Sequence, residues 1–281
     1  MTVKKPKKSQ QAATQVAPMR LQKEAPKKKA ASNAQSSAKN AVATRAVRAS
    51  YSNGTLTVNG VNYEMVWVLG GTFQMGGTAE QGSDAYDNEM PVHSVTLSSY
   101  YIGKTEVTQA LWKAVMGDNP SYFKGDNLPV EDVSWNDCQV FVRKLNSLTG
   151  QRFRLPTEAE WEYACRGGNN SRGYKYSGSN YIEDVAWYGD NSGSETHPVA
   201  SKSPNELGLY DMSGNVWEWC SDWYGSYTSV SQTNPQGPYD GSNRVIRGGF
   251  WDNNAGVCRS SLRSSFNPTY RFYGLGLRLA L

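Results

Sequence analysis

The sequence predicts an α+β domain, with a few amphipathic helices beside short, twisted antiparallel strands and long loops. The first observation is composition: 27 Gly, nine Trp and 17 Tyr in 281 residues favour many turns held by aromatic packing. The second is a set of β-prone runs that end in Gly or Asn-Gly turns. The third is a set of capped segments with apolar residues at helical spacing.

The strands are predicted from these runs and their turns. TLTV, Asn59-Gly60 and VNYEMVWV form a hairpin pattern, and Asn-Gly suits a two-residue type I′ turn. GGTFQMGG reads as a short strand closed by glycines, and a further strand is expected from about His93 to Ile102. The closing LGLRLAL is predicted to be the last strand.

Three helices are predicted from their ends. The first begins with Thr108 as N-cap and stops at Gly117, and the second extends from Ser134 to just before Gly150. The second places one apolar face at Cys138, Phe141, Val142, Leu145 and Leu148. In RLPTEAEWEYACRGG, a Thr-x-x-Glu capping box after a proline starts the third, and a Gly pair ends it. This third motif reads as structural.

The charge distribution divides the chain at about residue 50. Residues 1–50 hold twelve of the 29 Lys and Arg residues but only one of the 25 acidic residues. Residues 51–281 therefore hold 17 basic and 24 acidic residues. The first segment has no aromatic residue and is predicted to be a disordered basic tail. It is either a solvated tether to a carrier protein or an arm that contacts nucleic acid, an anionic surface or an acidic partner. Residues 51–281 are predicted to form the folded domain.

No signal peptide is recognisable in the sequence as written, and no apolar stretch is long enough for a transmembrane helix. The compartment therefore stays open. The four cysteines, Cys138, Cys165, Cys220 and Cys258, are far apart and form no CxxC pair. A zinc site is not expected, and buried free thiols are favoured over a disulfide framework.

NELGLYDMSGNVWEW concentrates hard oxygen ligands around a tight turn. Asp211, Asn215 and Glu218 flank the Ser213-Gly214 turn, and oxygen at that density suits Ca²⁺. The alternative is an Asx-turn in which a side chain holds its own backbone.

RLPTEAEWEYACRGG, GLYDMSGNVWEW and RVIRGGFW, in this order, resemble the sulfatase-modifying factor family, the formylglycine-generating enzyme domain, over roughly residues 60–281. The resemblance implies a loop-rich fold of the C-type-lectin-like group. It also implies a possible calcium site at the side chains of Asp211 and Glu218 and the carbonyls of Gly214 and Val216. The family's second calcium loop looks shorter here, so no second site is assigned.

The catalytic features implied by the resemblance do not match. Oxidase members carry a cysteine pair after the RGGS stretch that binds copper(I), whereas this sequence aligns Asn253 and Cys258 there and replaces the serine by Phe250. Asn is a poor ligand for copper(I). The iron-dependent branch needs a histidine cluster, and the chain has only His93 and His197. We therefore expect neither copper nor iron and no formylglycine-generating activity, with a rearranged metal-dependent oxidase as the alternative.

The C-terminal stretch also resembles the variable region of proteins diversified by retroelements in phages and bacteria. Its frame is RVIRGGxWxxNAGxCRSSxRxxxxPxxRxxxLGLRLAL, and such systems rewrite adenines in Asn codons of a template. Changing the first two letters of AAC cannot give Lys, Glu, Gln, Met or Trp, and none of these occurs from Asp252 to Leu281. The variable region is expected at about 250–274.

The predicted ligand-binding residues are Phe250, Asp252, Asn253, Val257, Leu262, Ser264, Ser265, Phe266, Asn267, Tyr270, Phe272 and Tyr273. Rigid aromatic rings among small polar residues are typical of adaptable recognition loops. The alternative for the four aromatics of 266–273 is burial in the core. Arg259, Arg263 and Arg271 are expected to hold the loops as scaffold.

The sequence therefore favours a non-catalytic ligand-binding protein that recognises a protein or glycan on another cell or particle. The second hypothesis is the rearranged oxidase. A third is a scaffold module whose basic tail binds nucleic acid.

Overall fold

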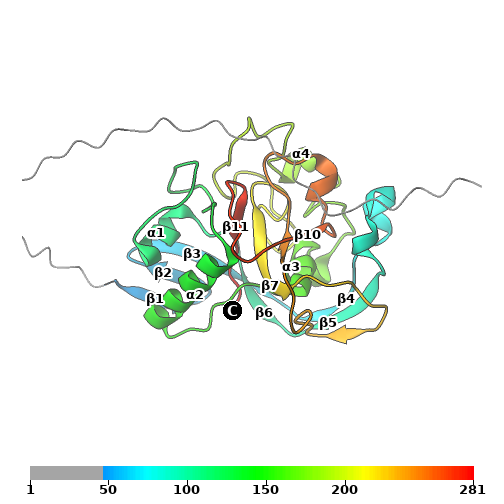
Figure 1. The fold of residues 1–281 in the computed structure, drawn as a ribbon, viewed down its shortest axis with the longest axis horizontal. Helices are drawn as coiled ribbons and strands as arrows, with labels where there is room; N and C mark the ends of the chain where they lie inside the picture. Colours follow the sequence, from blue (N-terminus) through cyan, green and yellow to red (C-terminus); the bar gives the residue numbers. More distant parts are fainter. Residues whose placement is uncertain (1–46) are drawn as a thin grey trace, which may run out of the picture. The chain divides into compact units, whose positions relative to one another are not determined.

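The computed structural model describes residues 47–281 (Figure 1). Most of the predicted basic tail lies outside this range. Strand β1 occupies Ala49–Ser52, so the folded part begins slightly before the predicted boundary at residue 51.

The strands form three small sheets. The first has the order β1 (Ala49–Ser52), β2 (Thr55–Val58), β3 (Val61–Val68), β6 (Tyr100–Gly103). The second has the order β10 (Arg263–Phe266), β9 (Arg244–Arg247), β7 (Trp217–Trp223), β11 (Leu275–Leu277). The third has the order β4 (Gly71–Met75), β5 (His93–Leu97), β8 (Gln232–Thr233).

The helices are short apart from α2. They are α1 (Gln109–Met116), α2 (Trp135–Thr149), α3 (Glu158–Cys165) and α4 (Ile182–Val185), with the 3₁₀ turns η1 (Ala79–Asp84), η2 (Asp87–Glu89), η3 (Gly168–Asn170) and η4 (Ala255–Cys258). Helices α1 and α2 lie against the first sheet, whereas α3 packs beside β7 and β4 (Figure 1). This is a loop-rich α+β fold, as the sequence predicts.

The predicted hairpin and caps are confirmed. Val58 pairs with Val61 across Asn59 and Gly60, which both have positive φ (51° and 87°), as a type I′ turn requires. The side chains of Thr108, Ser134 and Thr157 each accept a backbone N–H of the first turn of α1, α2 and α3. The observed helix starts agree with the predicted ones because capping involves residues only a few positions apart.

The predicted strand from His93 to Ile102 is two strands in different sheets. β5 ends at Leu97 and β6 starts at Tyr100. Between them, the Ser98 N–H donates to Asn234 Oδ1 and the Ser99 hydroxyl accepts the Gly70 N–H. These bonds form a corner that a run of β-prone residues does not reveal.

Two strand pairs are parallel, which the sequence prediction of antiparallel strands did not include. β11 pairs with β7 and β8 pairs with β5, in each case across a long stretch of chain. Pairing between distant segments depends on tertiary packing, so local patterns do not show its direction.

All four cysteines are buried and free, as predicted. Within residues 47–281, no helix is both long enough and apolar enough to cross a bilayer.

Arginines of the C-terminal part are buried against glutamates from earlier elements. Arg259 donates to both carboxylate oxygens of Glu89 at 2.9 and 2.6 Å. Arg263 and Glu158 pair in the same way, at 2.7 and 2.6 Å. Two further buried pairs are Arg247–Glu162 and Arg278–Glu218. In contrast, Arg271 pairs with Asp137 at the surface. The prediction that Arg259, Arg263 and Arg271 act as scaffold is confirmed for Arg259 and Arg263, whereas Arg271 makes only an exposed pair.

Replacing Arg259 by Met is expected to lower the free energy of unfolding by about 3–5 kcal/mol, because Glu89 is left buried without its cation. The matched control, Arg271→Met, removes an exposed pair and is expected to cost less than about 1 kcal/mol. Urea denaturation at pH 7 measures both, and equal losses would contradict the assignment of Arg259 as the structural pair.

The same pair predicts a pH dependence. Burial opposes ionisation of Glu89, but hydrogen bonds from Arg259 and Ser261 outweigh it and lower its pKa. A carboxylate with a lowered pKa stabilises the fold above its ordinary pKa and stops doing so in acid. The difference between Arg259→Met and the parent protein should therefore shrink below about pH 4.

Candidate functional site

Eight aromatic rings form one connected cluster around the loop between β10 and β11. We call this cluster the aromatic surface; its members are Tyr122, Phe123, Phe250, Trp251, Phe266, Tyr270, Phe272 and Tyr273. Neighbouring ring centroids are between 4.6 and 6.5 Å apart, mostly tilted or edge-on. Such spacing is typical of favourable aromatic pairs.

The surface has exposed tips and a buried base. Tyr122, Tyr270 and Tyr273 are 70%, 43% and 41% exposed. Phe266 and Phe272 are half-buried and pack against the main core, and Trp251 is buried with its Nε1 donating to the Tyr273 carbonyl. Of the four aromatics predicted in 266–273, two therefore face solvent and two lie partly in the core.

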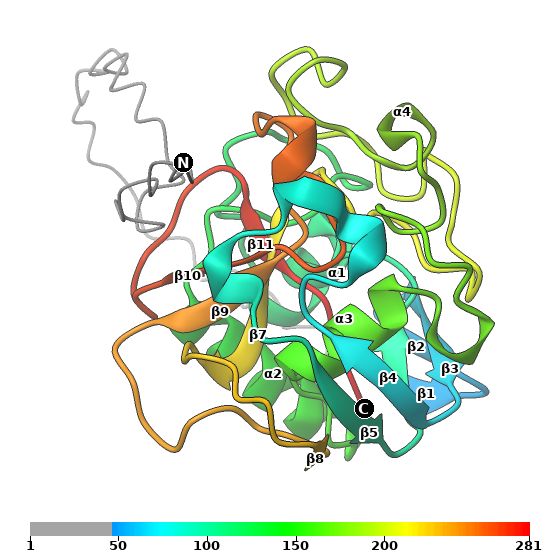
Figure 2. The same cartoon turned by 90° about the vertical axis from the view of Figure 1, so that its right-hand side faces the viewer.

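Backbone bonds hold the 267–274 loop against the start of α2. The N–H groups of Asn136 and Asp132 donate to the carbonyls of Pro268 and Phe272. At the far end, the Trp217 N–H donates to the Gly274 carbonyl where β11 joins β7. The loop connects β10 to β11 (Figure 1 and Figure 2), and these hydrogen bonds place it beside the start of α2. The rings are therefore presented from a loop that is fixed along its length.

The other predicted ligand-binding residues divide by burial. Asp252 and Asn267 are exposed, and Phe250, Ser264 and Ser265 are half-buried.

The prediction is wrong for Asn253, Val257 and Leu262, which are at most 4% exposed. The side chain of Asn253 accepts the Phe250 N–H and closes the turn, whereas Val257 and Leu262 lie in the main core. Their buried side chains leave no surface for a ligand.

Sequence reasoning missed Tyr122 and Phe123, which join the surface from the 117–131 loop. The signal was present, because SYF stands between GDNP and KGDN as large rings within turn-forming residues. Beneath them, Glu131 accepts the Phe123 N–H with Oε1, while its Oε2 has no partner among the described residues. Burial raises the pKa of Glu131 to about 7.

Cys258, the one matching family cysteine, is fully buried, and burial raises its pKa to about 12. The Cys258 thiol is therefore protonated at neutral pH and has no solvent exposure, whereas a reactive cysteine needs an accessible thiolate. His93 and His197 each contact a backbone carbonyl through one ring nitrogen, at 3.1 and 2.7 Å.

The residues aligned with the family calcium site lie in a buried acidic region. Asp211 Oδ2 accepts the Ala200 N–H at 2.7 Å. Glu218 accepts bonds from Arg278 and from Trp161 Nε1. Gly214 and Val216 lie in the turn between them, and Glu106 accepts the Val216 N–H. No three acidic, His or Cys side chains converge on one point among residues 47–281. A calcium ion here would depend partly on the carbonyls.

Several known proteins are similar to this chain. The family model of the sulfatase-modifying factor enzyme 1-like domain matches residues 54–281. The structure of Treponema denticola variable protein 1 is similar with a TM-score of 0.74 and 38% identity, covering 80% of this chain and 97% of that one.

Among curated proteins, the chaperone protein LppX of Paenibacillus barcinonensis is 35% identical, over 78% of this chain and 89% of its own length. The formylglycine-generating enzyme of Streptomyces coelicolor is 33% identical, over 75% of this chain and 87% of its own.

The division of the C-terminal segment into surface and core predicts opposite effects of two substitutions. Tyr270→Ala is expected to change the free energy of unfolding by less than about 1 kcal/mol, whereas Leu262→Ala is expected to cost about 2–5 kcal/mol through the cavity it leaves. Chemical denaturation followed by tryptophan fluorescence measures both. A large loss in Tyr270→Ala would place its ring in the core instead.

Proposed function

We propose that this chain, which belongs to the sulfatase-modifying factor enzyme 1-like domain family, uses the fold of that family to bind a ligand rather than to catalyse a reaction. The aromatic surface is the binding site, and a protein or a glycan on another cell or particle is the ligand. The observation behind this proposal is the exposure of Tyr270 and Tyr273 on a loop fixed by backbone bonds and framed by buried arginine pairs.

The chemistry of the surface supports recognition. Tyrosine offers a large rigid face and one hydroxyl, and it loses little conformational entropy on binding. Asp252 and Asn267 add exposed polar groups near these rings in the sequence. Rings of this kind in a half-desolvated cluster are typical of binding hot spots.

We further propose that a retroelement diversifies residues 250–274, so that related copies of the protein would present different side chains on the aromatic surface. The similarity to a solved variable protein supports this reading. The buried positions Asn253, Val257 and Leu262 should then tolerate few residues, so effective variation would concentrate on the exposed positions. The basic tail, outside the described residues, would tether the domain to a carrier or an anionic surface.

The family's enzymes make an oxidase the competing proposal. Two features weigh against it: Cys258 is buried with a raised pKa, and the aligned partner position is the turn-forming Asn253.

A library experiment tests the binding proposal. Positions 252, 264, 265, 267, 270 and 273 are diversified, displayed on phage and selected against hen lysozyme as a model protein. Specific binders are expected, and Tyr122→Ala in them should weaken binding by about 2 kcal/mol, because Tyr122 is a fixed part of the surface. The control variant is Tyr239→Ala, a ring that is 100% exposed and outside the aromatic surface.

A matched library at Asn253, Val257 and Leu262 should yield mostly unfolded protein. If the first library also unfolds, or yields no binder over several rounds, the proposal fails.

We also propose that the buried acidic region binds a structural calcium ion. Asp211 would provide a carboxylate oxygen, and Gly214 and Val216 would provide carbonyls. Glu218 would have to share oxygens that already accept hydrogen bonds from Arg278 and Trp161. The support is electrostatic: Glu106, Asp211 and Glu218 are buried near one cation, Arg278. Burial raises the pKa of Asp211 to about 6. Hard oxygens with excess negative charge suit calcium, which would supply the missing positive charge.

Calcium is therefore expected to stabilise the protein, by about 2.7 kcal/mol at a hundredfold excess over Kd. Because its pKa is raised, Asp211 costs stability as the pH rises from its ordinary value through about 6, and the ion should offset this cost. The gain in Tm should be larger at pH 7.5 than at pH 5 and absent in Asp211→Asn. Equal melting with calcium and with EDTA at pH 7.5 would exclude the site.

A further inference from the structure

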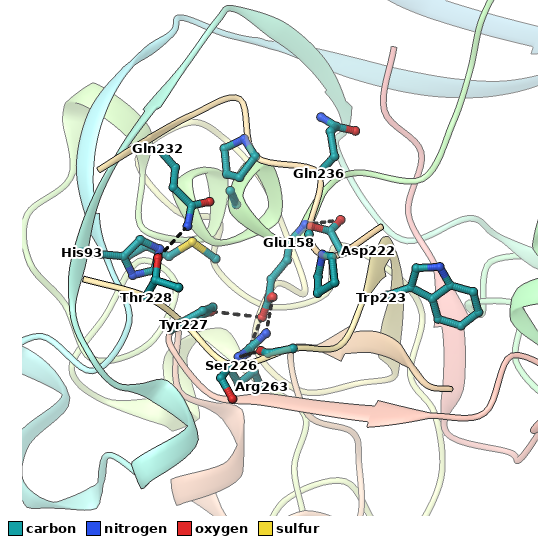
Figure 3. Close-up of a pocket in the computed structure, with 16 residues that line it drawn as sticks. His93, Glu158, Asp222, Trp223, Ser226, Tyr227, Thr228, Gln232, Gln236 and Arg263 are labelled. Carbon is teal, nitrogen blue, oxygen red and sulfur yellow. Dashed lines mark hydrogen bonds and ion pairs between the residues drawn. The ribbon is translucent and has the colours of Figure 1, made fainter. Parts of the chain in front are cut away.

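A pocket lies beside the amino end of α3, and Arg263 is its one lining residue from the predicted variable region. It has a volume of about 380 Å³, within the range of roughly 300–1,000 Å³ typical of small-ligand sites. Its inner wall comes from α3, β5 and the end of β7, and its outer wall from the segment 225–238 (Figure 3). Neither the aromatic surface nor the proposed calcium site uses it.

The outer wall is held close to the inner one. β8 pairs with β5 at Val95 and Thr96, which anchors the middle of the covering segment. Gly237, with φ of 72°, approaches Asp222 so closely that an added Cβ would lie 2.8 Å from the Asp222 Cβ. The pocket therefore lies under the 225–238 segment, which strand pairing and the close approach of Gly237 hold against β5 and β7.

Asp222 is the unpaired charge of this pocket. Asp222 is 4% exposed, and its Oδ2 accepts hydrogen bonds from the Glu158 N–H and from the Ser221 hydroxyl. Its Oδ1 accepts no hydrogen bond from the described residues, and no described cation forms an ion pair with it. By contrast, Glu158 in the same pocket is fully occupied by Arg263 and Tyr227.

The remaining walls combine apolar groups with the neutral polar side chains of Ser226, Thr228, Gln232 and Gln236, which can accept hydrogen bonds as well as donate them. Met75, Ala159, Pro235 and Pro238 supply apolar contact, and Tyr227 and Trp223 supply rings. His93 contacts the Pro91 carbonyl through Nδ1; in a neutral imidazole this contact requires the proton on Nδ1 and leaves Nε2 as an acceptor. In Figure 3, His93 lies on one side of the pocket and Asp222 on the other.

We propose that this pocket binds an organic monocation, a primary ammonium group on a short alkyl stem, with Asp222 as its counter-ion. The ammonium would donate to Asp222 Oδ1, and the stem would lie along the apolar walls. Such a group could be a free amine or a lysine side chain of a partner, and the chemistry is the same.

Other ligand classes fit less well. An anion would face Asp222 and Glu158, and the one lining guanidinium, Arg263, already serves Glu158. A metal ion would need several oxygen or nitrogen ligands, and the His, Asp and Glu side chains of this pocket form no group of three that could hold one, as far as residues 47–281 are described. At a pH where Asp222 is ionised, a neutral ligand would leave its charge uncompensated.

Binding of a cation here should depend on pH. Burial, and then the charge of Glu158, raise the pKa of Asp222 to about 7. The charged or titratable groups around it are Glu158 and Glu160 on α3, Arg154 before it, His93 on β5, Arg244 on β9, Arg263 on β10 and Tyr227 in the covering segment. An ammonium ion requires the carboxylate, so its binding should displace the proton.

The test uses the full chain and n-butylammonium, with 1-butanol and butyrate as neutral and anionic matches of the same stem. Isothermal titration at pH 8 is expected to detect only n-butylammonium. Its affinity should be roughly thirtyfold weaker at pH 5.5, with proton release seen by comparing two buffers at pH 7. His93→Gln should keep this pH dependence, which separates Asp222 from the imidazole. N-acetyl-lysine methylamide then asks whether a lysine side chain within a peptide can enter.

Asp222→Asn keeps the shape and the acceptor for the Glu158 N–H but removes the charge. It should lower the affinity for n-butylammonium at least tenfold and abolish proton release. The control is Asp240→Asn, which removes an exposed carboxylate outside the pocket lining. The proposal is overturned if 1-butanol binds as tightly as n-butylammonium, if Asp222→Asn binds n-butylammonium unchanged, or if the parent protein does not bind it at pH 8. If a variant does not fold, the pH dependence of binding to the parent protein decides.

Discussion

Buried pairing between arginines of the C-terminal part and glutamates of earlier elements is the constraint on which the rest of the structure depends. Arg259 reaches Glu89 and Arg263 reaches Glu158, so both ends of the 259–263 segment are fixed from inside. A buried ion pair adds little net stability, but removing one partner is costly. The pairs therefore specify where this segment lies, and the exposed loop that follows inherits a fixed position.

Under the proposed function, this arrangement separates folding from ligand binding within one stretch of sequence. The arginines, the glycines after β9 and the strand β11 belong to the fold, whereas Tyr270 and Tyr273 lie outside it. A site built on a fixed frame loses less entropy on binding than one on a mobile loop. The separation is incomplete, since Phe266 and Phe272 contact both the core and the exposed rings. Substitutions at these two positions should affect stability and recognition together.

Local interactions were predictable from sequence, and long-range ones were not. The caps at Thr108, Ser134 and Thr157 and the Asn-Gly hairpin depend on residues a few positions apart. The parallel pairing of β11 with β7 joins segments far apart in the chain. Burial of Val257 and Leu262 likewise depends on long-range packing in the main core. The genetic-code pattern of the variable region had placed both residues among the ligand-binding positions. Tyr122 stands out in the sequence as a large ring among turn-forming residues, but only the fold brings it beside Tyr273, 151 positions away.

The pairing of the last strand has a consequence for how the domain is made. Leu275–Leu277 pair with Trp217–Trp219, Ala280 bridges Ile102 and Arg154, and Leu281 exchanges backbone bonds with Tyr101. None of these contacts can form during synthesis until the ribosome has passed the whole 250–274 segment. Contacts of such long sequence separation close late in folding. Any substitution within that segment is thus present before the native sheet is complete, so the folding step itself can reject substitutions that fit poorly.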